Sequence, residues 1–222
     1  MFIQETTPND LDDLEKKLRL NQFRGGTAAV YMEPVGPESG TTPITVEYVK
    51  GVERLCRKYG ALLVFDEVVT GFRIGMAGAQ GYFGVSPDLT IFGKVIAGGY
   101  PGAGGIGGKR EYMKYLGAGL DSSGKKIHKA LVGGTMTANP LSCCAGYFTL
   151  EEIERTNACQ KAGQMGDRIC AGLKELVKKH GLPFGLTEHL GASFFWWSTN
   201  KGADTWGPYK GVPYDGNDPA YQ

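Results

Sequence analysis

The feature that most constrains the fold of this chain is an alternation of short apolar segments with longer segments of helical character. Apolar runs at 28–32, 61–65 and 89–92 have the length of strands, and each is followed within two positions by a charged residue. Short buried strands that alternate with helices indicate a parallel sheet. The sequence therefore predicts an α/β fold, with a mainly parallel sheet flanked by helices.

Four longer segments are expected to form the helices. They cover residues 9–20, 43–59, 139–153 and 158–180. Apolar side chains in the second and fourth recur at intervals of three and four, as on the buried face of a helix. Asn9 is expected to cap the first helix, and Pro43 and Gly60 are expected to bound the second. Asn139 is expected to open the third.

Glycine is concentrated at 98–108, where the flanking residues are apolar. We expect a tight loop packed against a site rather than a flexible linker, with a strand around Ile106 and a helix from about Lys109. Beyond about residue 184 the pattern fades, apart from an apolar stretch at 191–197 that is typical of a strand. The expected organisation is one domain over 1–184 and the beginning of a second over 185–222.

Charge and cysteine content bound the possible partners. The chain has 24 basic and 23 acidic residues without a basic run, so composition gives no support for nucleic-acid binding. No apolar window approaches the length of a membrane span, and none at the N-terminus has the pattern of a signal peptide. The five cysteines and three histidines lack metal-ligand spacing. We expect mostly buried thiols, no metal site and a cytoplasmic location.

Charged side chains follow three of the predicted strands. Glu33, Asp66 and Lys94 each lie at or just beyond the end of an apolar run. In parallel sheets the carboxyl ends of the strands meet at one edge, where ligands bind. A lysine in that place can be a surface cation, a phosphate ligand or a nucleophile toward a carbonyl carbon. The residues alone leave these three roles open.

Several ordered motifs narrow the choice. Residues 9–180 resemble fold-type I pyridoxal-phosphate enzymes, more narrowly class III aminotransferases, and most of all glutamate-1-semialdehyde aminomutases. The resemblance implies a fold-type I large domain that is incomplete, followed by the start of a C-terminal small domain. The motifs that carry it are EPV at 33–35, DEVVTGFR at 66–73, GAQGYFG at 78–84, PDLT at 87–90, GK at 93–94 and GTMTANP at 134–140.

The resemblance also implies residue roles. Lys94 would form the internal aldimine with pyridoxal 5'-phosphate and then move a proton from the substrate α-carbon. Asp66 would pair with the pyridine nitrogen and keep it protonated, since an adjacent anion favours the cationic form. Val68 would pack against the ring. Thr135 would reach the cofactor phosphate of a partner subunit, which implies a homodimer with shared active sites.

One position departs from better-known relatives. Many class III transaminases carry glutamine where this chain has Val69, and an apolar residue there is typical of the aminomutase-like branch. In that branch an asparagine can supply the contact to the ring oxygen, and Glu38 occupies the corresponding place. A carboxylate beside a phenolate oxygen repels it. We therefore expect an altered cofactor titration or a different orientation of Glu38.

The implied reaction is an amino/oxo exchange within one small amino-aldehyde substrate, giving 5-aminolevulinate. A class III ω- or β-amino-acid transaminase would use the same Lys94 and Asp66, so it stays an alternative. Family members carry a cofactor-phosphate loop before the segment that matches residue 9. The chain is therefore expected to be an internal fragment, and a catalytically incomplete subunit that needs a second chain is a further alternative.

Overall fold

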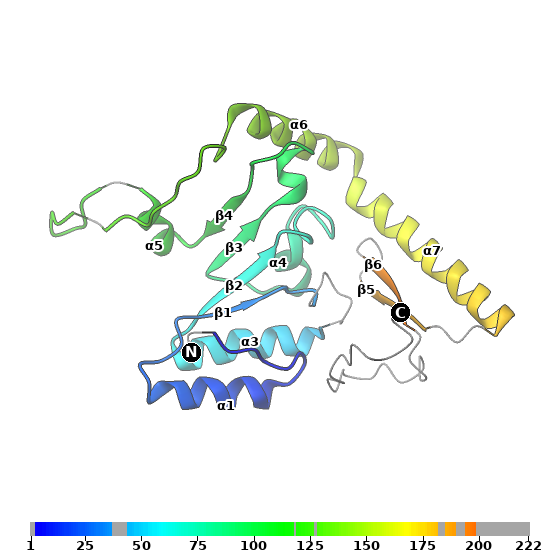
Figure 1. Cartoon of the computed structure of the whole chain (residues 1–222), viewed down its shortest axis with the longest axis horizontal. Helices are drawn as coiled ribbons and strands as arrows, with labels where there is room; N and C mark the ends of the chain where they lie inside the picture. Colours follow the sequence, from blue (N-terminus) through cyan, green and yellow to red (C-terminus); the bar gives the residue numbers. More distant parts are fainter. Residues whose placement is uncertain are drawn as a thin grey trace.

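The fold is built on a four-stranded sheet with the strand order β1-β2-β3-β4. The computed structural model describes residues 3–36, 44–117, 119–126, 128–181, 185–189 and 194–198. Strands β1, β2 and β3 run parallel, whereas β4 pairs antiparallel with β3 (Figure 1). The expected α/β fold with a mainly parallel sheet is therefore confirmed. The strands are β1 (Ala29–Met32), β2 (Leu62–Glu67), β3 (Leu89–Phe92) and β4 (Gly105–Gly108).

Helices flank this sheet on the two sides visible in Figure 1, with α1 and α3 lying together near β1 and α6 lying beyond β3 and β4. A second, two-stranded antiparallel sheet pairs β5 (Gly185–His189) with β6 (Phe194–Ser198). The helices are α1 (Leu11–Gln22), α3 (Val46–Tyr59), α4 (Gly78–Phe83), α5 (Arg110–Met113), α6 (Pro140–Thr156) and α7 (Ala158–His180), and two short 3₁₀ helices are η1 (Lys94–Ala97) and η2 (Lys114–Leu116).

The core lies between α3 and one face of the sheet. Along α3 the apolar side chains recur every three or four residues, so Val49, Val52 and Cys56 fall on one buried stripe. They join Leu63 and Phe65 of β2 in a single cluster of buried side chains. Burial of each large aliphatic or aromatic side chain contributes about 2 kcal/mol. This packing fixes which face of β2 is covered.

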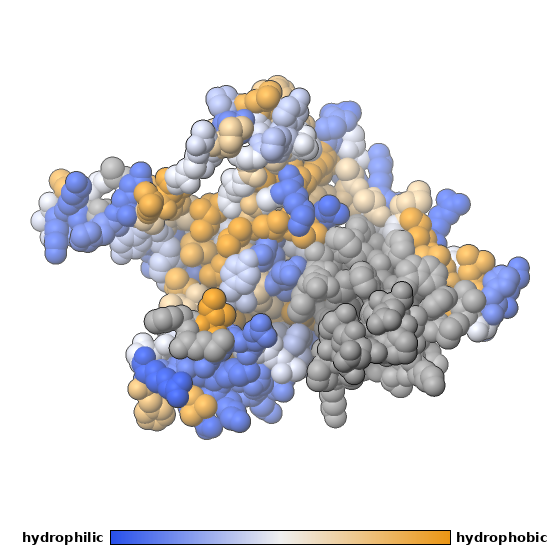
Figure 2. Space-filling view, in the orientation of Figure 1, coloured by the Kyte–Doolittle hydropathy of each residue, from blue (hydrophilic) through white to orange (hydrophobic). Residues whose placement is uncertain are grey.

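The opposite face of the sheet is more open. Side chains alternate along a strand, so Asp66 lies on the face opposite to Phe65 and Glu67. Tyr31 of β1 pairs in register with Val64 and therefore shares the face of Asp66. Figure 2 shows apolar surface over the strands, between α1 and α3 on one side and α6 on the other.

Several predicted helix ends need correction. Asp10 caps α1 in place of Asn9, because its side chain accepts a hydrogen bond from the Asp13 N–H at 2.8 Å. Asn9 instead has φ 61° and accepts a hydrogen bond from the Thr45 N–H at 2.9 Å. Gly60 ends α3 at φ 69° and Asn139 caps α6, as predicted. The start of α3 is later than predicted, because Thr45 caps it by accepting from the Tyr48 N–H at 3.1 Å; Pro43 itself lies outside the described residues.

Other expectations are only partly met. The predicted strand around Ile106 is β4, but the helix expected from Lys109 has just four residues, Arg110–Met113. The expectation of mostly buried thiols is wrong, because only Cys56 and Cys170 are buried, whereas Cys143 and Cys144 are exposed. The proposed division at residue 184 stays a prediction, since most of 185–222 lies outside the described residues.

Candidate active site

Three of the predicted site residues, Asp66, Val68 and Lys94, lie at the carboxyl edge of the parallel strands. Glu67 of β2 is in register with Phe92 of β3, so the two strands end side by side. Asp66 is the penultimate residue of β2, and Lys94 begins η1 two residues after β3. Val68 lies beside the backbone that precedes Lys94, because a Cβ built on Gly93 would stand 3.1 Å from Val68 Cγ1. Glycine at 93 thus lets the valine approach the backbone that leads to Lys94.

The carboxylate of Asp66 is held by two donors. Its Oδ1 accepts a hydrogen bond from the Val68 N–H at 2.9 Å, and its Oδ2 accepts one from the Tyr31 hydroxyl. The hydrogen bond to Asp66 is the main reason that the pKa of Tyr31 is raised to about 12, with burial and the charges of Asp66 and Glu33 adding to it. A carboxylate has about four lone-pair positions, so both oxygens can accept a further donor.

Lys94 has a backbone conformation that is unusual for a residue with a Cβ. Its φ of 50° lies in the left-handed region, and its side chain is exposed at the sheet edge. Such a conformation costs about 1–2 kcal/mol and is commonest at functional sites. The lysine is therefore presented outward from a strained turn between β3 and η1.

Helix α6 supports the segment that carries Lys94. Gly146 of α6 lies so close to η1 that a Cβ there would overlap the carbonyl oxygen of Ile96. A Cβ on Gly98 would in turn stand 2.5 Å from the Ala145 carbonyl carbon. These close backbone approaches require glycine on both sides. They fix the position of η1 against α6, and so the position of Lys94 at the start of η1.

Thr135 lies in a turn just before α6, with an exposed side chain. The first turn of α6 contacts the glycine-rich segment, because the Ser142 hydroxyl donates to the Pro101 carbonyl oxygen at 2.6 Å. Asn139 caps α6 by accepting from the Ser142 N–H at 3.0 Å. The glycine-rich segment therefore contacts α6 at Pro101, but most of its residues are exposed and its last four form β4, so the expected tight loop is found only in part. Glu38 lies outside the described residues.

Glu67 is an acid that sequence reasoning did not single out. Its side chain is 1% exposed and points to the core face, opposite to Asp66. Its Oε2 accepts from the Ala79 N–H at 2.7 Å and from the Thr70 hydroxyl at 3.3 Å, while Oε1 is buried without a hydrogen bond. Burial raises the pKa of Glu67. The side chain ties the end of β2 to α4.

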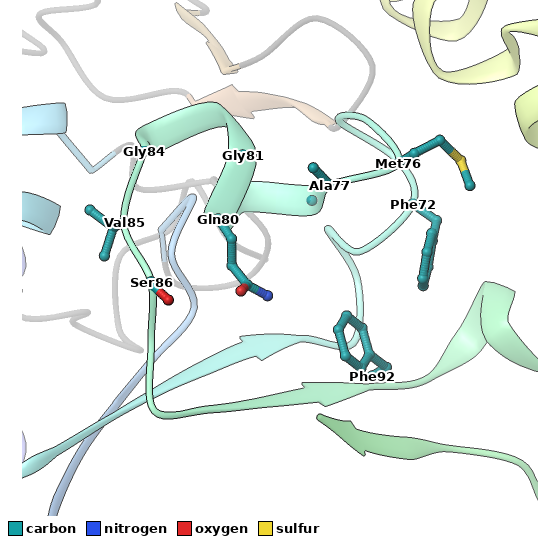
Figure 3. A pocket seen from close by; sticks show the side chains of 10 residues that line it. Phe72, Met76, Ala77, Gln80, Gly81, Gly84, Val85, Ser86 and Phe92 are labelled. Atoms are coloured by element: carbon teal, nitrogen blue, oxygen red, sulfur yellow. The ribbon is translucent and has the colours of Figure 1, made fainter. Parts of the chain in front are cut away.

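Two pockets lie away from Asp66 and Lys94. One of about 530 Å³ lies between α4 and β3, where Phe72 and Phe92 stand with ring centroids 5.7 Å apart (Figure 3). Gln80 points from α4 toward the sheet and donates to the Thr90 hydroxyl at 3.0 Å. The other, of about 680 Å³, lies where α6 meets α7 and includes Cys159. The lining residues of neither pocket include the predicted site residues.

Comparison with known families decides the relationship. The profile of the family "Aminotransferase class-III" matches residues 4–185. The chain belongs to the class-III aminotransferase family. This match includes β1 to β4 and the Asp66 and Lys94 positions.

Individual relatives of this class-III aminotransferase chain are named for two activities. A glutamate-1-semialdehyde 2,1-aminomutase of Staphylococcus epidermidis is 39% identical over 197 residues, 89% of this chain and 43% of that protein. An omega-transaminase of Sphaerobacter thermophilus has a TM-score of 0.73 at 30% identity, over 87% of this chain and 42% of that chain. A transaminase solved with PLP bound has a TM-score of 0.73 at 27% identity, over 88% and 43%. The class-III chain thus spans less than half the length of these relatives.

In the described part of the class-III chain, no helix combines the length and apolar character needed to cross a bilayer. Within the same residues, no group of three or more histidine, cysteine or acidic side chains is placed to hold a metal ion.

Sequence reasoning missed Tyr31 as a neighbour of Asp66. The strand containing Tyr31 was predicted, and alternation along it limits the tyrosine to one of two faces. Which face, and which partner, depend on the β1-β2 register, in which Tyr31 pairs with Val64. No short-range signal in the sequence specifies that register. Tyr31 could have been found only by pairing the two strands correctly.

Proposed function

We propose that this chain carries the cofactor-binding edge of a pyridoxal-phosphate enzyme that transfers amino groups. The single observation that carries the proposal is the placement of Asp66 and Lys94 at the ends of the neighbouring parallel strands β2 and β3. Val68, just after β2, contacts Gly93, just after β3, so the two strand ends are in apolar contact. The PLP bound to a related transaminase gives independent support.

The residues of this edge fit the cofactor chemically. Pyridoxal phosphate, when bound, supplies an electron sink for a carbanion, and the protein orients and tunes it. The carboxylate of Asp66 has lone pairs left to accept the proton-bearing ring nitrogen. The exposed amine of Lys94 would hold the cofactor and carry a proton to and from the substrate α-carbon. Val68 would pack against the ring.

Among amino-transfer reactions we favour that of glutamate-1-semialdehyde aminomutase, which acts on a small amino-aldehyde. The relative from Staphylococcus epidermidis, 39% identical, supports this choice. Val69, in the place where many transaminases have glutamine, supports it as well. The alternative is a class III ω- or β-amino-acid transaminase, supported by the likeness to the omega-transaminase of Sphaerobacter thermophilus.

We further propose that the working unit is a homodimer in the cytoplasm. Thr135 stands exposed in its turn, where its hydroxyl is available to a phosphate in a partner subunit. Glu38 is proposed to lie near the ring oxygen of the cofactor. All five cysteines are described and none forms a disulfide, which fits a reducing compartment.

Absorbance spectroscopy tests the cofactor proposal. The purified chain is titrated with pyridoxal 5'-phosphate, and the same titration is made with Lys94→Ala, Asp66→Asn and the control Lys114→Ala. We expect a new visible absorbance band in the wild-type chain and in the control, none in Lys94→Ala, and weaker binding in Asp66→Asn. A wild-type spectrum equal to that of Lys94→Ala would contradict the proposal.

Product analysis separates the two reactions. An aminomutase converts glutamate-1-semialdehyde to 5-aminolevulinate without an amino acceptor, whereas a transaminase needs a second oxo compound. If the chain binds the cofactor but turns over neither substrate, the incomplete-subunit alternative is favoured. Activity on a β- or ω-amino acid that requires an acceptor would replace the aminomutase proposal.

A further inference from the structure

The neighbour of Asp66 on β1 suggests how that acid is kept in place. Tyr31 and Asp66 come from separate strands, 35 positions apart in sequence, and share the open face of the sheet. The Tyr31 hydroxyl donates to Asp66 Oδ2, while the Val68 N–H donates to Oδ1. Each carboxylate oxygen therefore has its own donor, one a side-chain hydroxyl on β1 and the other a backbone N–H just after β2.

Two donors restrain the carboxylate of Asp66 more than one donor would. The final torsion of an aspartate side chain is broad, so a carboxylate with a single bond rotates easily. The Val68 N–H belongs to the same strand end as Asp66 and limits only one oxygen. Tyr31 is a rigid side chain anchored one strand away, so its bond sets the plane of the carboxylate. Each oxygen still has a lone pair for a ring nitrogen.

We propose that Tyr31 is a positioning residue that orients the Asp66 carboxylate toward the ring nitrogen of pyridoxal phosphate. This inference rests on the proposed cofactor site and assigns a residue to it that family resemblance did not. The charged groups that act on the Tyr31 hydroxyl are Asp66 on β2 and Glu33 beyond β1. Both are acids, and both favour the protonated phenol that donates the bond.

The contact itself can be measured without cofactor. The chain has 11 tyrosines, and each can be followed by NMR after ¹³C labelling at Cζ. The resonance that is missing in Tyr31→Phe belongs to Tyr31. At pH 11 a phenol with a pKa of about 12 is roughly nine-tenths protonated, whereas an ordinary phenol is roughly nine-tenths ionised. We expect Tyr31 to stay protonated in the wild-type chain and to ionise in Asp66→Asn, with amide spectra confirming that both are folded. If the chains unfold at pH 11, the two are compared at the highest pH at which both stay folded. Equal ionisation of Tyr31 in the wild-type chain and in Asp66→Asn would show that the contact is absent.

The positioning role is tested with two cofactors. One is pyridoxal 5'-phosphate, and the other is its 1-deaza analogue, in which carbon replaces the ring nitrogen. We expect Tyr31→Phe to weaken binding of the natural cofactor about tenfold, as for a lost hydrogen bond to a charged group, and to leave binding of the analogue unchanged. A matched control is Tyr147→Phe, since Tyr147 is 59% exposed against 58% for Tyr31 and donates to Glu151 on α6. It should change neither affinity.

The possible outcomes are distinct. If Tyr31→Phe weakens the binding of both cofactors equally, Tyr31 only supports the fold. If it changes the affinity for neither, Asp66 is positioned without Tyr31. Either result overturns the inference and leaves the proposed cofactor site unaffected. A wild-type chain that binds neither cofactor overturns the proposed function and this inference together. The NMR measurement then still decides whether Tyr31 donates to Asp66.

Discussion

At the scale of single residues, Lys94 combines an exposed amine with a left-handed backbone. Its φ of 50° is imposed by the turn from β3 into η1, where Gly93 precedes it and η1 packs on α6. A Cβ in this conformation approaches the neighbouring carbonyl oxygen. The chain thus carries a local cost at the residue that the proposed chemistry needs, as is common at functional sites.

Replacing the side chain measures this cost. Lys94→Gly removes the Cβ, and Lys94→Ala keeps it, while both remove the amine. We expect the glycine variant to have a free energy of unfolding about 1 kcal/mol higher than the alanine variant. Urea denaturation of both chains provides the comparison. Equal stability of the two would mean that the turn is not strained.

Asp66, Val68 and Lys94 were predictable because their chemistry stands at the ends of recognisable strands. The structure places all three at one sheet edge, although their roles stay predictions. Tyr31 was not predictable, since its partner depends on strand register, and register is decided by packing over the whole sheet. Glu67 was missed because its burial depends on α4, which is only six residues long.

At the scale of elements, Asp88 ties three segments together just before β3. Its carboxylate accepts from Arg57 of α3 at 2.6 Å, from Lys109 after β4 at 2.6 Å, and from the Leu63 N–H of β2 at 2.8 Å. The residue is 0% exposed. Burial opposes its ionisation, but the bonds from Arg57, Lys109 and Leu63 outweigh that effect, so the pKa of Asp88 is lowered.

Removing this charge should destabilise the sheet. We expect Asp88→Asn to lower the free energy of unfolding by about 2 kcal/mol at pH 7, because two cations lose their buried partner. The matched control is Glu152→Gln, which breaks an exposed pair with Arg155 of the same 2.6 Å length and should cost less than about 0.5 kcal/mol. Denaturation of the three chains at pH 7 gives the values. Equal losses would show that burial of Asp88 adds nothing.

The same residue gives a pH dependence. Its folded pKa lies below the ordinary value of 3.8, so the folded state binds fewer protons than the unfolded state near that pH. The stabilisation by Asp88 is therefore complete above about pH 5 and is lost as the pH falls through 3.8 toward the folded pKa. We expect stability to fall less steeply in Asp88→Asn over this range. Parallel slopes in both chains would contradict the assignment.

The contact between η1 and α6 links packing to the site. We expect Gly146→Ala to cost about 2 kcal/mol and to weaken cofactor binding, because its Cβ would displace the η1 backbone that presents Lys94. Gly172→Ala in α7 is the control, since a Cβ there meets no atom within 4 Å. It should stabilise the helix by about 1 kcal/mol. Thermal denaturation and the cofactor titration provide the comparison. A Gly146→Ala chain as stable as Gly172→Ala, with the same affinity for the cofactor, would contradict this prediction.

Elements with strong local signals were the best predicted. The spans of α6 and α7 followed from periodicity and from the Asn139 cap. The start of α1 was wrong by one cap residue, because Asn9 bonds instead to Thr45, far along the chain. The antiparallel direction of β4 and the shortness of α5 depend on packing that glycine-rich sequences do not encode locally.

At the scale of the whole molecule, α6 exposes apolar side chains on the side away from η1. Leu141 and Phe148, seven residues apart and therefore on one face, are exposed, as is Cys144 between them. An exposed apolar face of this kind is typical of an interface. It fits the proposed homodimer, in which Thr135 just before α6 would approach a partner subunit.

Sedimentation equilibrium tests the dimer. We expect Phe148→Lys to weaken self-association at least tenfold, since burial of a phenylalanine contributes about 2 kcal/mol. Phe23→Lys, which changes an exposed phenylalanine just after α1, should leave it unchanged. A wild-type chain that stays monomeric at all concentrations would contradict the dimer proposal.

The central claim is that Lys94 holds pyridoxal phosphate beside Asp66. The most direct measurement is borohydride reduction of the purified chain with pyridoxal 5'-phosphate, followed by proteolysis and peptide mass spectrometry. We predict that the cofactor mass is found on the peptide containing Lys94, and that labelling falls strongly in Asp66→Asn. Cofactor mass spread evenly over several lysines, or found on other lysines but not on Lys94, would contradict the claim.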